Sequence, residues 1–363
     1  MPKHLELGVF MPIANNGWII SENAPQYLPS WELSKEIGQY AESIGFDFLF
    51  SMIKWRGFGG ATQHWEHSLE SVSLMSGLAA VTERVKIIAS MQPLIFNPAV
   101  AAKMAATATD ISGGRFGINL VTGTYFDEYA QMGVLPEGYG AVRYDYAQEW
   151  IDAVKALWTN ERVTYRGQHF QLEDCAGNQA LMKGRTPTIV CAGMSDRGMA
   201  FTAENGDLNF LTGTDYASLK AMSLRSKEIA AGLSKSTKTA TVLVVVIADT
   251  DEEAAAQVES YRDGVDVEAW KNIYNIYAKD GEGATAEALR EQAKKDVFFA
   301  FLPVYGSPET VAKTLTELAV DGDLDAVLMT FPDYIEGLRR INEDVKPIME
   351  KLGVTFSTTP ALA

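Results

Sequence analysis

The stretch RFGINLVTGTYFDE, residues 115–128, begins as an apolar strand and ends in a polar loop that carries Asn119, Thr124 and Glu128. The glycine pair directly before it predicts the end of a helix, because glycine tolerates the left-handed backbone that closes many helices. A strand with such an exit is typical of the floor of an active site. The alternative is an ordinary core strand with a polar exit loop.

Strand-like and helix-like segments alternate on both sides of this stretch. Apolar strands are expected at residues 5–11, 46–52, 85–90, 115–120, 188–192, 208–211, 240–248 and 326–331. Helices are expected near residues 31–44, 69–83, 99–111, 143–158, 197–205, 216–232, 251–263, 307–319 and 334–351. Eight such units predict an α/β fold, a closed (β/α)8 TIM barrel with the site at the strand C-terminal ends. A doubly wound open sheet is the alternative.

The chain of 363 residues shows no compositional break, so residues 1–363 are interpreted as one barrel domain. Insertions are expected after strands four and seven, at about 129–142, 160–185 (with a hairpin at 163–174) and 265–302, and the tail from about 355 is expected to fray. The first of these insertions is interpreted as a glycine-rich loop that leads to a helix beginning at Arg143.

Composition narrows the classes of function. The net charge of -16 disfavours nucleic acid and acidic membrane surfaces as partners. Cys175 and Cys191 have neither the spacing of a disulfide framework nor a neighbouring histidine cluster. The N-terminus lacks the apolar core of a signal peptide, and the longest apolar run is too short to span a bilayer, so a cytoplasmic protein is expected.

In a barrel the strand exits converge, so unusual exits are candidate site residues. Ser195 follows a glycine at the start of an expected helix, where free N–H groups and the helix dipole favour a phosphate; a plain helix cap is the alternative. Arg143 and Tyr144 could contact the same phosphate, or be a surface cation and a half-buried ring. The loop at residues 53–60, with two cations, two aromatic rings and three glycines, fits a flat aromatic ligand.

Two other patterns carry less weight. His64, His67 and Glu70 stand three residues apart, but no further ligands cluster nearby, so no metal site is predicted. Phosphate-loop, nucleophile-elbow and dinucleotide fingerprints are absent from the sequence. A barrel with a phosphate-binding helix start and aromatic rings at the strand exits suits flavin mononucleotide (FMN).

The motifs that carry a family resemblance are SMIKWRGFGG (51–60), NNGW (15–18), APQY (24–27), ISGGRFG (111–117), NLVTG (119–123) and CAG (191–193). Together they resemble the bacterial luciferase-like flavin monooxygenases over about residues 7–351. Within that family they are most similar to the pyrimidine monooxygenase branch of the Rut pathway of uracil degradation.

The resemblance implies a two-component monooxygenase. Such an enzyme takes reduced FMN from a separate NAD(P)H:flavin reductase, uses O2 as co-substrate, and cleaves a nitrogen heterocycle through a flavin N5-peroxide. A homodimer or homotetramer is usual for relatives. The matched cofactor-binding positions are Ile53, Lys54, Asn119, Glu128, Arg143, Tyr144, Gly193 and Ser195.

The matched catalytic positions are Met52, Lys54, Ser90 and Asn119. Asn119 and Ser90 are expected to hold oxygen beside the flavin, and Lys54 to stabilise negative charge. The alternative for Lys54 is a salt bridge at the barrel rim.

The expected substrate pocket contains Trp55, Phe58 and Thr124. Thr124 stands where the family usually has Trp, and the segment 91–98 after the third strand also differs from the pyrimidine enzyme, so the substrate could be uracil, a pyridine-type ring or a sulfone. Ser90 stands where the pyrimidine enzyme has Thr, a change that keeps the hydroxyl and loses a methyl. A deazaflavin-dependent hydride-transfer enzyme and a non-catalytic flavin-binding barrel are the rival functions.

Overall fold

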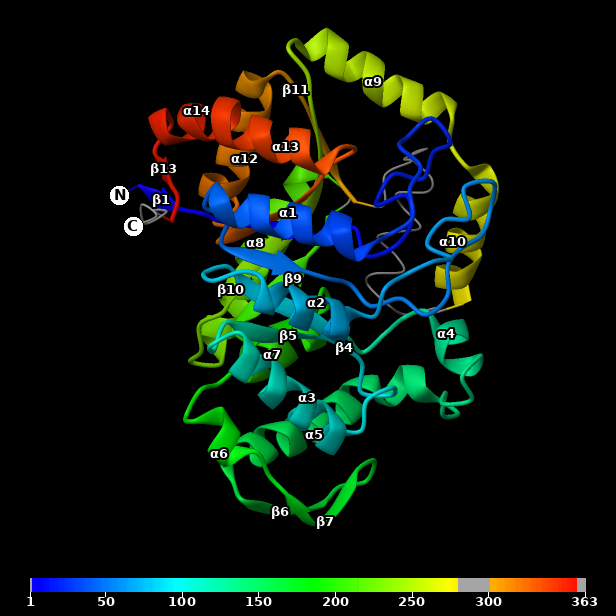
Figure 1. The fold of residues 1–363 in the computed structure, drawn as a ribbon, viewed down its shortest axis with the longest axis vertical. Helices are drawn as coiled ribbons and strands as arrows, with labels where there is room; N and C mark the ends of the chain where they lie inside the picture. Colours follow the sequence, from blue (N-terminus) through cyan, green and yellow to red (C-terminus); the bar gives the residue numbers. More distant parts are fainter. Residues whose placement is uncertain (1, 214, 280–300, 358–363) are drawn as a thin grey trace.

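The computed structural model describes residues 2–213, 215–279 and 301–357 (Figure 1). Eight parallel strands close into a barrel, which confirms the predicted fold class. The barrel strands, in spatial order, are β2 (Glu6–Phe10), β3 (Phe48–Phe50), β4 (Lys86–Met91), β5 (Phe116–Leu120), β8 (Thr188–Cys191), β9 (Leu208–Leu211), β10 (Lys238–Ile247) and β12 (Ala326–Thr330). Closure occurs where β10 pairs with β9 and β12 pairs with β2.

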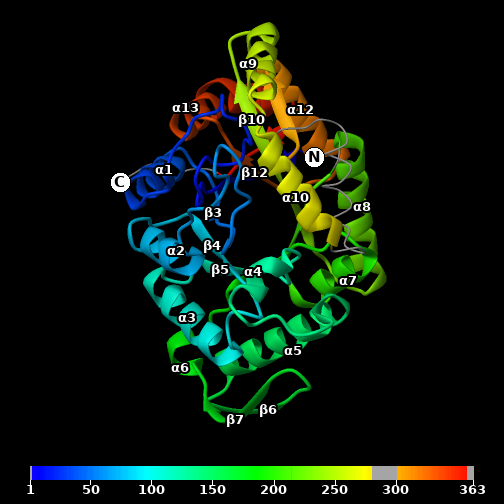
Figure 2. The same cartoon turned by 90° about the vertical axis from the view of Figure 1, so that its right-hand side faces the viewer.

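Helices surround the strands and leave the barrel mouth facing the viewer in Figure 2. The helices before the hairpin are α1 (Trp31–Ser43), α2 (Ser71–Ala80), α3 (Pro98–Ile111), α4 (Phe126–Ala130) and α5 (Tyr139–Thr159). Those after it are α6 (Gln179–Met182), α7 (Asp196–Asn205), α8 (Tyr216–Gly232), α9 (Asp251–Asp263), α10 (Val267–Lys279), α12 (Pro308–Asp321), α13 (Tyr334–Arg340) and α14 (Lys346–Lys351). A π-helical turn, Ile341–Val345, joins α13 to α14.

Two apolar layers hold the barrel together. Inside it, Phe50 stacks on Phe210 with ring centroids 5.4 Å apart, and Phe10 lies 5.1 Å from Phe50. Outside it, the alternate strand residues pack on the helices, for example Ile118 and Leu120 of β5. Strands buried on both faces are expected for a parallel barrel, since helices cover one side and side chains fill the other.

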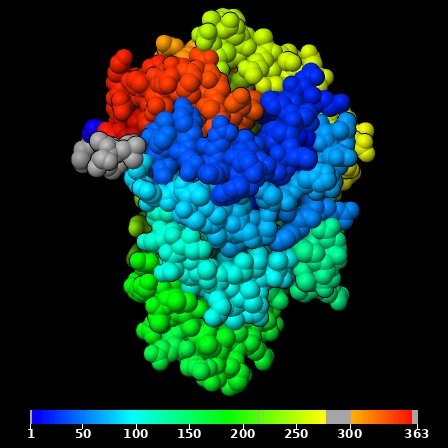
Figure 3. Space-filling view, in the orientation of Figure 1, coloured from blue at the N-terminus to red at the C-terminus, as the bar shows by residue number. Residues whose placement is uncertain are grey.

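The chain ends meet on one side of the barrel. Residues Lys3–His4 form β1, which pairs in parallel with β13 (Val354–Thr355). Figure 3 shows the N-terminal helix α1, in blue, beside the C-terminal helices in red. Thr355, where the tail was expected to fray, is therefore paired with His4, and residues 358–363 lie outside the described residues.

The structure corrects the start of α5. The glycine-rich segment after α4 was interpreted as a loop up to Arg143, but α5 begins at Tyr139, where Gly138 supplies a left-handed residue (φ 70°) as its N-cap. The buried Tyr139 donates a hydrogen bond to the Thr122 carbonyl at 2.7 Å, which ties the helix start to the exit of β5. Because α5 begins at Tyr139, Arg143 and Tyr144 lie in its second turn and not at its start.

The insertions contain more regular structure than the sequence predicts. The predicted hairpin is β6 (Arg162–Arg166) with β7 (Gln171–Ala176), and it packs along α5, away from the barrel mouth (Figure 1). An unpredicted strand, β11 (Pro303–Gly306), pairs with the C-terminal half of β10. The long β10 therefore contacts β9 with its first half and β11 with its second half. Residues 280–300 of the third insertion lie outside the described residues.

Among the described residues, no helix has the length and apolar composition needed to cross a bilayer.

Candidate active site

A cavity of about 760 Å³, its open mouth included, lies at the C-terminal end of the barrel. The predicted site residues that line it are Ile53, Lys54, Thr124, Glu128, Tyr144 and Gly193. The predicted residues that do not line it are Met52, Trp55, Phe58, Ser90, Asn119, Arg143 and Ser195. The strand exits therefore converge, as the barrel geometry predicts.

A chain of hydrogen bonds fixes Asn119 inside the barrel, just below the exit of β5. Asn119 is paired in register with Ser90 of β4, and its Nδ2 donates to the Ser90 Oγ at 2.9 Å. The Ser90 hydroxyl in turn donates to the Ser51 carbonyl at 2.6 Å. Because a carbonyl can only accept, the proton of Ser90 is already used, and Asn119 must present its nitrogen to Ser90.

This network leaves one buried acceptor without a partner. No described residue donates to the Oδ1 of Asn119, although the side chain is almost fully buried. An unsatisfied buried carbonyl costs about 1–3 kcal/mol, and such atoms are uncommon in native structures. The Asn119 carbonyl is therefore suited to accept a hydrogen bond from an N–H group of a bound molecule.

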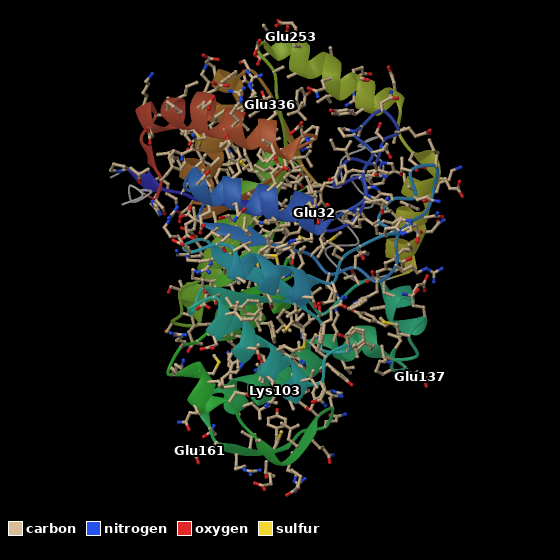
Figure 4. All side chains as sticks on the ribbon, viewed as in Figure 1. Glu32, Lys103, Glu137, Glu161, Glu253 and Glu336 are labelled. Atoms are coloured by element: carbon tan, nitrogen blue, oxygen red, sulfur yellow. The ribbon has the colours of Figure 1, made fainter. Side chains whose placement is uncertain are left out.

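A buried ion pair forms part of the cavity wall. The Lys54 ammonium lies 3.1 Å from the Glu128 Oε1, and the two side chains are 8% and 3% exposed. By contrast, the charged side chains labelled in Figure 4 are all exposed: Glu32, Lys103, Glu137, Glu161, Glu253 and Glu336. The same Glu128 oxygen accepts from the backbone N–H of Trp55 at 2.9 Å and of Arg56 at 3.3 Å. Glu128 thus joins the loop after β3 to α4.

Three aromatic rings enclose the Lys54 ammonium. Its Nζ lies 5.0 Å from the Tyr125 ring centroid, 5.1 Å from that of Phe58 and 5.6 Å from that of Trp65. Ring faces attract cations within about 6 Å, most strongly where water is excluded. Burial also raises the pKa of Tyr125 to about 12, so its phenol stays neutral beside the ion pair. The site therefore holds one fixed cation whose position is set by Glu128 and three rings.

His64 packs against this aromatic group. It is fully buried and stacked on Trp65 with centroids 4.9 Å apart, and burial lowers its pKa to about 3. Among the described residues, no group of three or more His, Cys, Asp or Glu side chains is arranged to hold a metal ion.

The exit loop of β2 has a structural role. The carboxamides of Asn15 and Asn16 donate to the backbone carbonyls of Gln63 at 2.8 Å and Thr62 at 2.7 Å. These asparagines, which stand at a chemically unusual strand exit, therefore hold the neighbouring aromatic loop in place.

The start of α7 forms a close-packed glycine cradle beside the cavity. A Cβ added at Gly193 would lie 2.2 Å from the Gly198 carbonyl oxygen, and one added at Gly198 would lie 2.5 Å from the Tyr144 hydroxyl. Gly193 is held by Asn209, whose Oδ1 accepts from its N–H at 3.1 Å. Only glycine permits this approach of backbone, helix start and phenol.

Ser195 caps α7 as predicted. Its Oγ accepts from the Gly198 N–H at 3.2 Å. The exposed Arg197 extends over the Tyr144 ring, with its guanidinium carbon 5.3 Å from the ring centroid, and pairs with Asp145 at 2.7 Å. The Arg143 guanidinium lies 5.8 Å from the same ring. The two predicted anion-binding groups, the α7 start and the Arg143–Tyr144 pair, are thus adjacent.

The remaining predicted residues support the cavity. Met52 packs between the two apolar layers, and Phe58 is stacked on Tyr125. Trp55 donates from its indole Nε1 to the Gln92 Oε1 at 2.8 Å.

Sequence reasoning missed Gln92, Tyr125 and Asn209. Gln92 was detectable, because it follows Ser90 by two residues, and residues two apart on a strand share a face. The other two act through contacts between distant segments, which leave no local pattern.

Comparisons with known proteins agree with this geometry. The family description "Luciferase-like monooxygenase" matches residues 5–324. The pyrimidine monooxygenase RutA of Acinetobacter baylyi is 43% identical over 357 residues, covering 95% of each chain. The corresponding Escherichia coli protein is 40% identical, covering 95% of this chain and 96% of its own.

Solved structures share the fold at low identity. A riboflavin lyase superposes with a TM-score of 0.80 at 23% identity, covering 99% of this chain and 94% of its own. An F420-dependent secondary alcohol dehydrogenase superposes with a TM-score of 0.71 at 17% identity, covering 95% of this chain and 99% of its own. At these identities the likeness shows the fold alone, whereas the family match and the relatives above 40% identity show the family. The chain therefore belongs to the luciferase-like monooxygenase family, as its strand-exit motifs predict.

Proposed function

We propose that this protein is a two-component, flavin-dependent monooxygenase that oxidises a pyrimidine ring with reduced FMN and O2. The observation that carries the proposal is the buried, unpartnered Oδ1 of Asn119, fixed by Ser90 inside the barrel just below the exit of β5. Relatives named as pyrimidine monooxygenases at 40–43% identity support the same reaction class.

The residues present fit an FMN. The carbonyl of Asn119 offers an acceptor for a ring N–H. The Gly193 and Gly198 N–H groups are bonded to Asn209 and Ser195, so the other backbone N–H groups in the first turn of α7, beside the glycine cradle, would contact a phosphate. Arg143 and Tyr144 lie close to that cradle and would contact the phosphate from α5. Lys54 and Glu128 would flank the ring system from the cavity wall. Reduced FMN, when bound, supplies the electrons that activate O2.

In this reaction the residues of the chain would orient the bound groups and exclude water from them. Asn119 keeps one N–H for Ser90 and has a second N–H and a carbonyl to direct at bound groups. Ser90 is a positioning residue, since its only proton goes to the Ser51 carbonyl. Lys54 keeps a positive charge at the wall, and the rings of Phe58, Trp65 and Tyr125 exclude water around it. A fixed charge in such a site stabilises developing negative charge without reorganisation.

The reductase is proposed as a separate NAD(P)H-dependent protein that delivers reduced FMN. The active protein is proposed to be a homodimer or homotetramer in the cytoplasm.

The test combines the purified protein, reduced FMN, O2 and a panel of uracil, thymine, pyridine and dimethyl sulfone. The proposal requires an oxygen-dependent product from a pyrimidine. A product from the sulfone alone would reassign the substrate class. Turnover only with a reduced deazaflavin, independent of O2, would reassign the reaction, and tight FMN binding without any turnover would favour a non-catalytic barrel.

A further inference from the structure

Trp55 is held at three separate atoms. Its backbone N–H donates to Glu128 at 2.9 Å, its carbonyl accepts from the Gln131 Nε2 at 2.8 Å, and its indole Nε1 donates to the Gln92 Oε1 at 2.8 Å. A large ring fixed in this way has little freedom to move when a ligand enters. The indole can therefore impose an orientation on the group it contacts.

The group it contacts is the carboxamide of Gln92, which lines the cavity and is only 2% exposed. An indole N–H is a donor only, so it selects the oxygen of the amide. The two N–H bonds of Gln92 are then on the opposite side of the same planar group. Among the described residues, none accepts a hydrogen bond from this nitrogen, and the residue lines the cavity.

Lys54 and Thr124 line the same cavity as Gln92. The Lys54 ammonium is paired with Glu128, whereas the Nε2 of Gln92 carries two N–H groups that contact no acceptor among the described residues. A donor in a cavity wall discriminates against bound ligands that cannot accept, because such a ligand covers the donor and leaves it without a partner.

We infer that the Trp55–Gln92 pair is a specificity subsite that reads a hydrogen-bond acceptor on the substrate, such as a ring carbonyl oxygen or a ring nitrogen. This inference rests on the proposed function, since it assigns the cavity to a planar heterocycle. It identifies Gln92 as the residue that contacts the substrate and Trp55 as the residue that positions Gln92.

The test measures binding rather than turnover. FMN-loaded protein is titrated with uracil and pyridine, which carry acceptors, and with toluene, a planar ring without one. The measured quantity is the preference, meaning the ratio of the toluene Kd to the uracil Kd. Gln92→Glu keeps the oxygen that Trp55 contacts but replaces the donor by a second acceptor, and Gln92→Met removes both.

Both variants are expected to lower the preference by roughly 5- to 10-fold, the worth of one hydrogen bond, with toluene affinity and FMN affinity unchanged. Gln39→Met is the matched control, because that exposed glutamine donates to the Val81 carbonyl and does not line the cavity. It should leave the preference at the wild-type value.

Trp55→Phe keeps a ring but removes the N–H that orients the amide. It should lower the preference in the wild-type background and have no further effect in the Gln92→Met background, since the two residues act as a unit. Additive effects would overturn the positioning role of Trp55.

An unchanged preference in Gln92→Glu, or an equal loss of toluene and uracil affinity, would overturn the inference. Wild-type protein that shows the preference but forms no oxygenated product would overturn the proposed function alone. Uracil turnover with the wild-type preference kept in Gln92→Glu would overturn the subsite alone.

Discussion

Neutralising Glu128 should destabilise the protein far more than breaking a surface ion pair. In Glu128→Gln the Oε1 acceptor for Trp55 is retained, but the Lys54 ammonium, on a side chain that is 8% exposed, loses its anionic partner at 3.1 Å. Removing one partner of a buried pair costs about 3–5 kcal/mol, because an uncompensated charge remains buried. The aromatic rings contact the Lys54 ammonium in the wild type and in the variant alike, so they do not change this difference. We therefore expect a loss of about 3–5 kcal/mol in the free energy of unfolding.

The assay is urea unfolding followed by tryptophan fluorescence. The double variant Lys54→Met, Glu128→Gln removes both charges and should recover most of the lost stability. Asp110→Asn is the matched control, since Asp110 pairs with Lys183 at a similar 3.0 Å but both side chains are more than half exposed. That variant should lose less than about 1 kcal/mol.

An unfolding midpoint of Glu128→Gln at the same urea concentration as the wild type would contradict this prediction. The prediction would also be refuted if the double variant were less stable than Glu128→Gln, because the cost would then come from lost packing.

Three further perturbations test other parts of the site. Asn119→Ala should abolish oxygenation while FMN binding stays within a few-fold of wild type, measured by product formation and by flavin fluorescence; unchanged turnover would remove its assigned role. Gly198→Ala places a Cβ 2.5 Å from the Tyr144 hydroxyl and should weaken FMN binding at least about tenfold, whereas Gly232→Ala, with open space around it, should not. His64 has a folded pKa of about 3 against an ordinary 6.5, so the unfolded chain binds the extra proton and stability falls as pH drops from 6.5 towards 3, by up to about 1.4 kcal/mol per pH unit. His64→Phe should flatten that slope in urea titrations between pH 6.5 and 4, and an unchanged slope would show that other groups cause it.

The barrel was predictable because its signals are local. Each strand is a short apolar run, and each N-cap residue directly precedes its helix in the sequence, as Ser30 and Ser195 show. Where a local signal was misleading, the prediction failed. Gly138 and Pro136 resemble a loop, yet a contact to Thr122 makes Tyr139 a helix start. The strand β11 was missed because it is short and depends on the edge of β10 for its pairing.

The candidate site was predictable in its location but not in its contacts. The exits of β3, β5 and β8 were expected to converge, and they do. The resemblance named Lys54 and Glu128 separately, but their ion pair joins residues 74 positions apart and appears only in three dimensions. Ser90 was expected to face oxygen with its hydroxyl, whereas the nearby Ser51 carbonyl takes that proton. Polar partners compete for a single hydrogen, and only coordinates show which partner is closest.

We propose that this chain transfers one oxygen atom from O2 to a pyrimidine. The most direct test supplies the purified protein with reduced FMN and uracil under ¹⁸O₂ and measures the mass of the product. We expect a product that carries one ¹⁸O atom and that does not form without O2. A product without ¹⁸O, or equal product formation under anaerobic conditions, would contradict it.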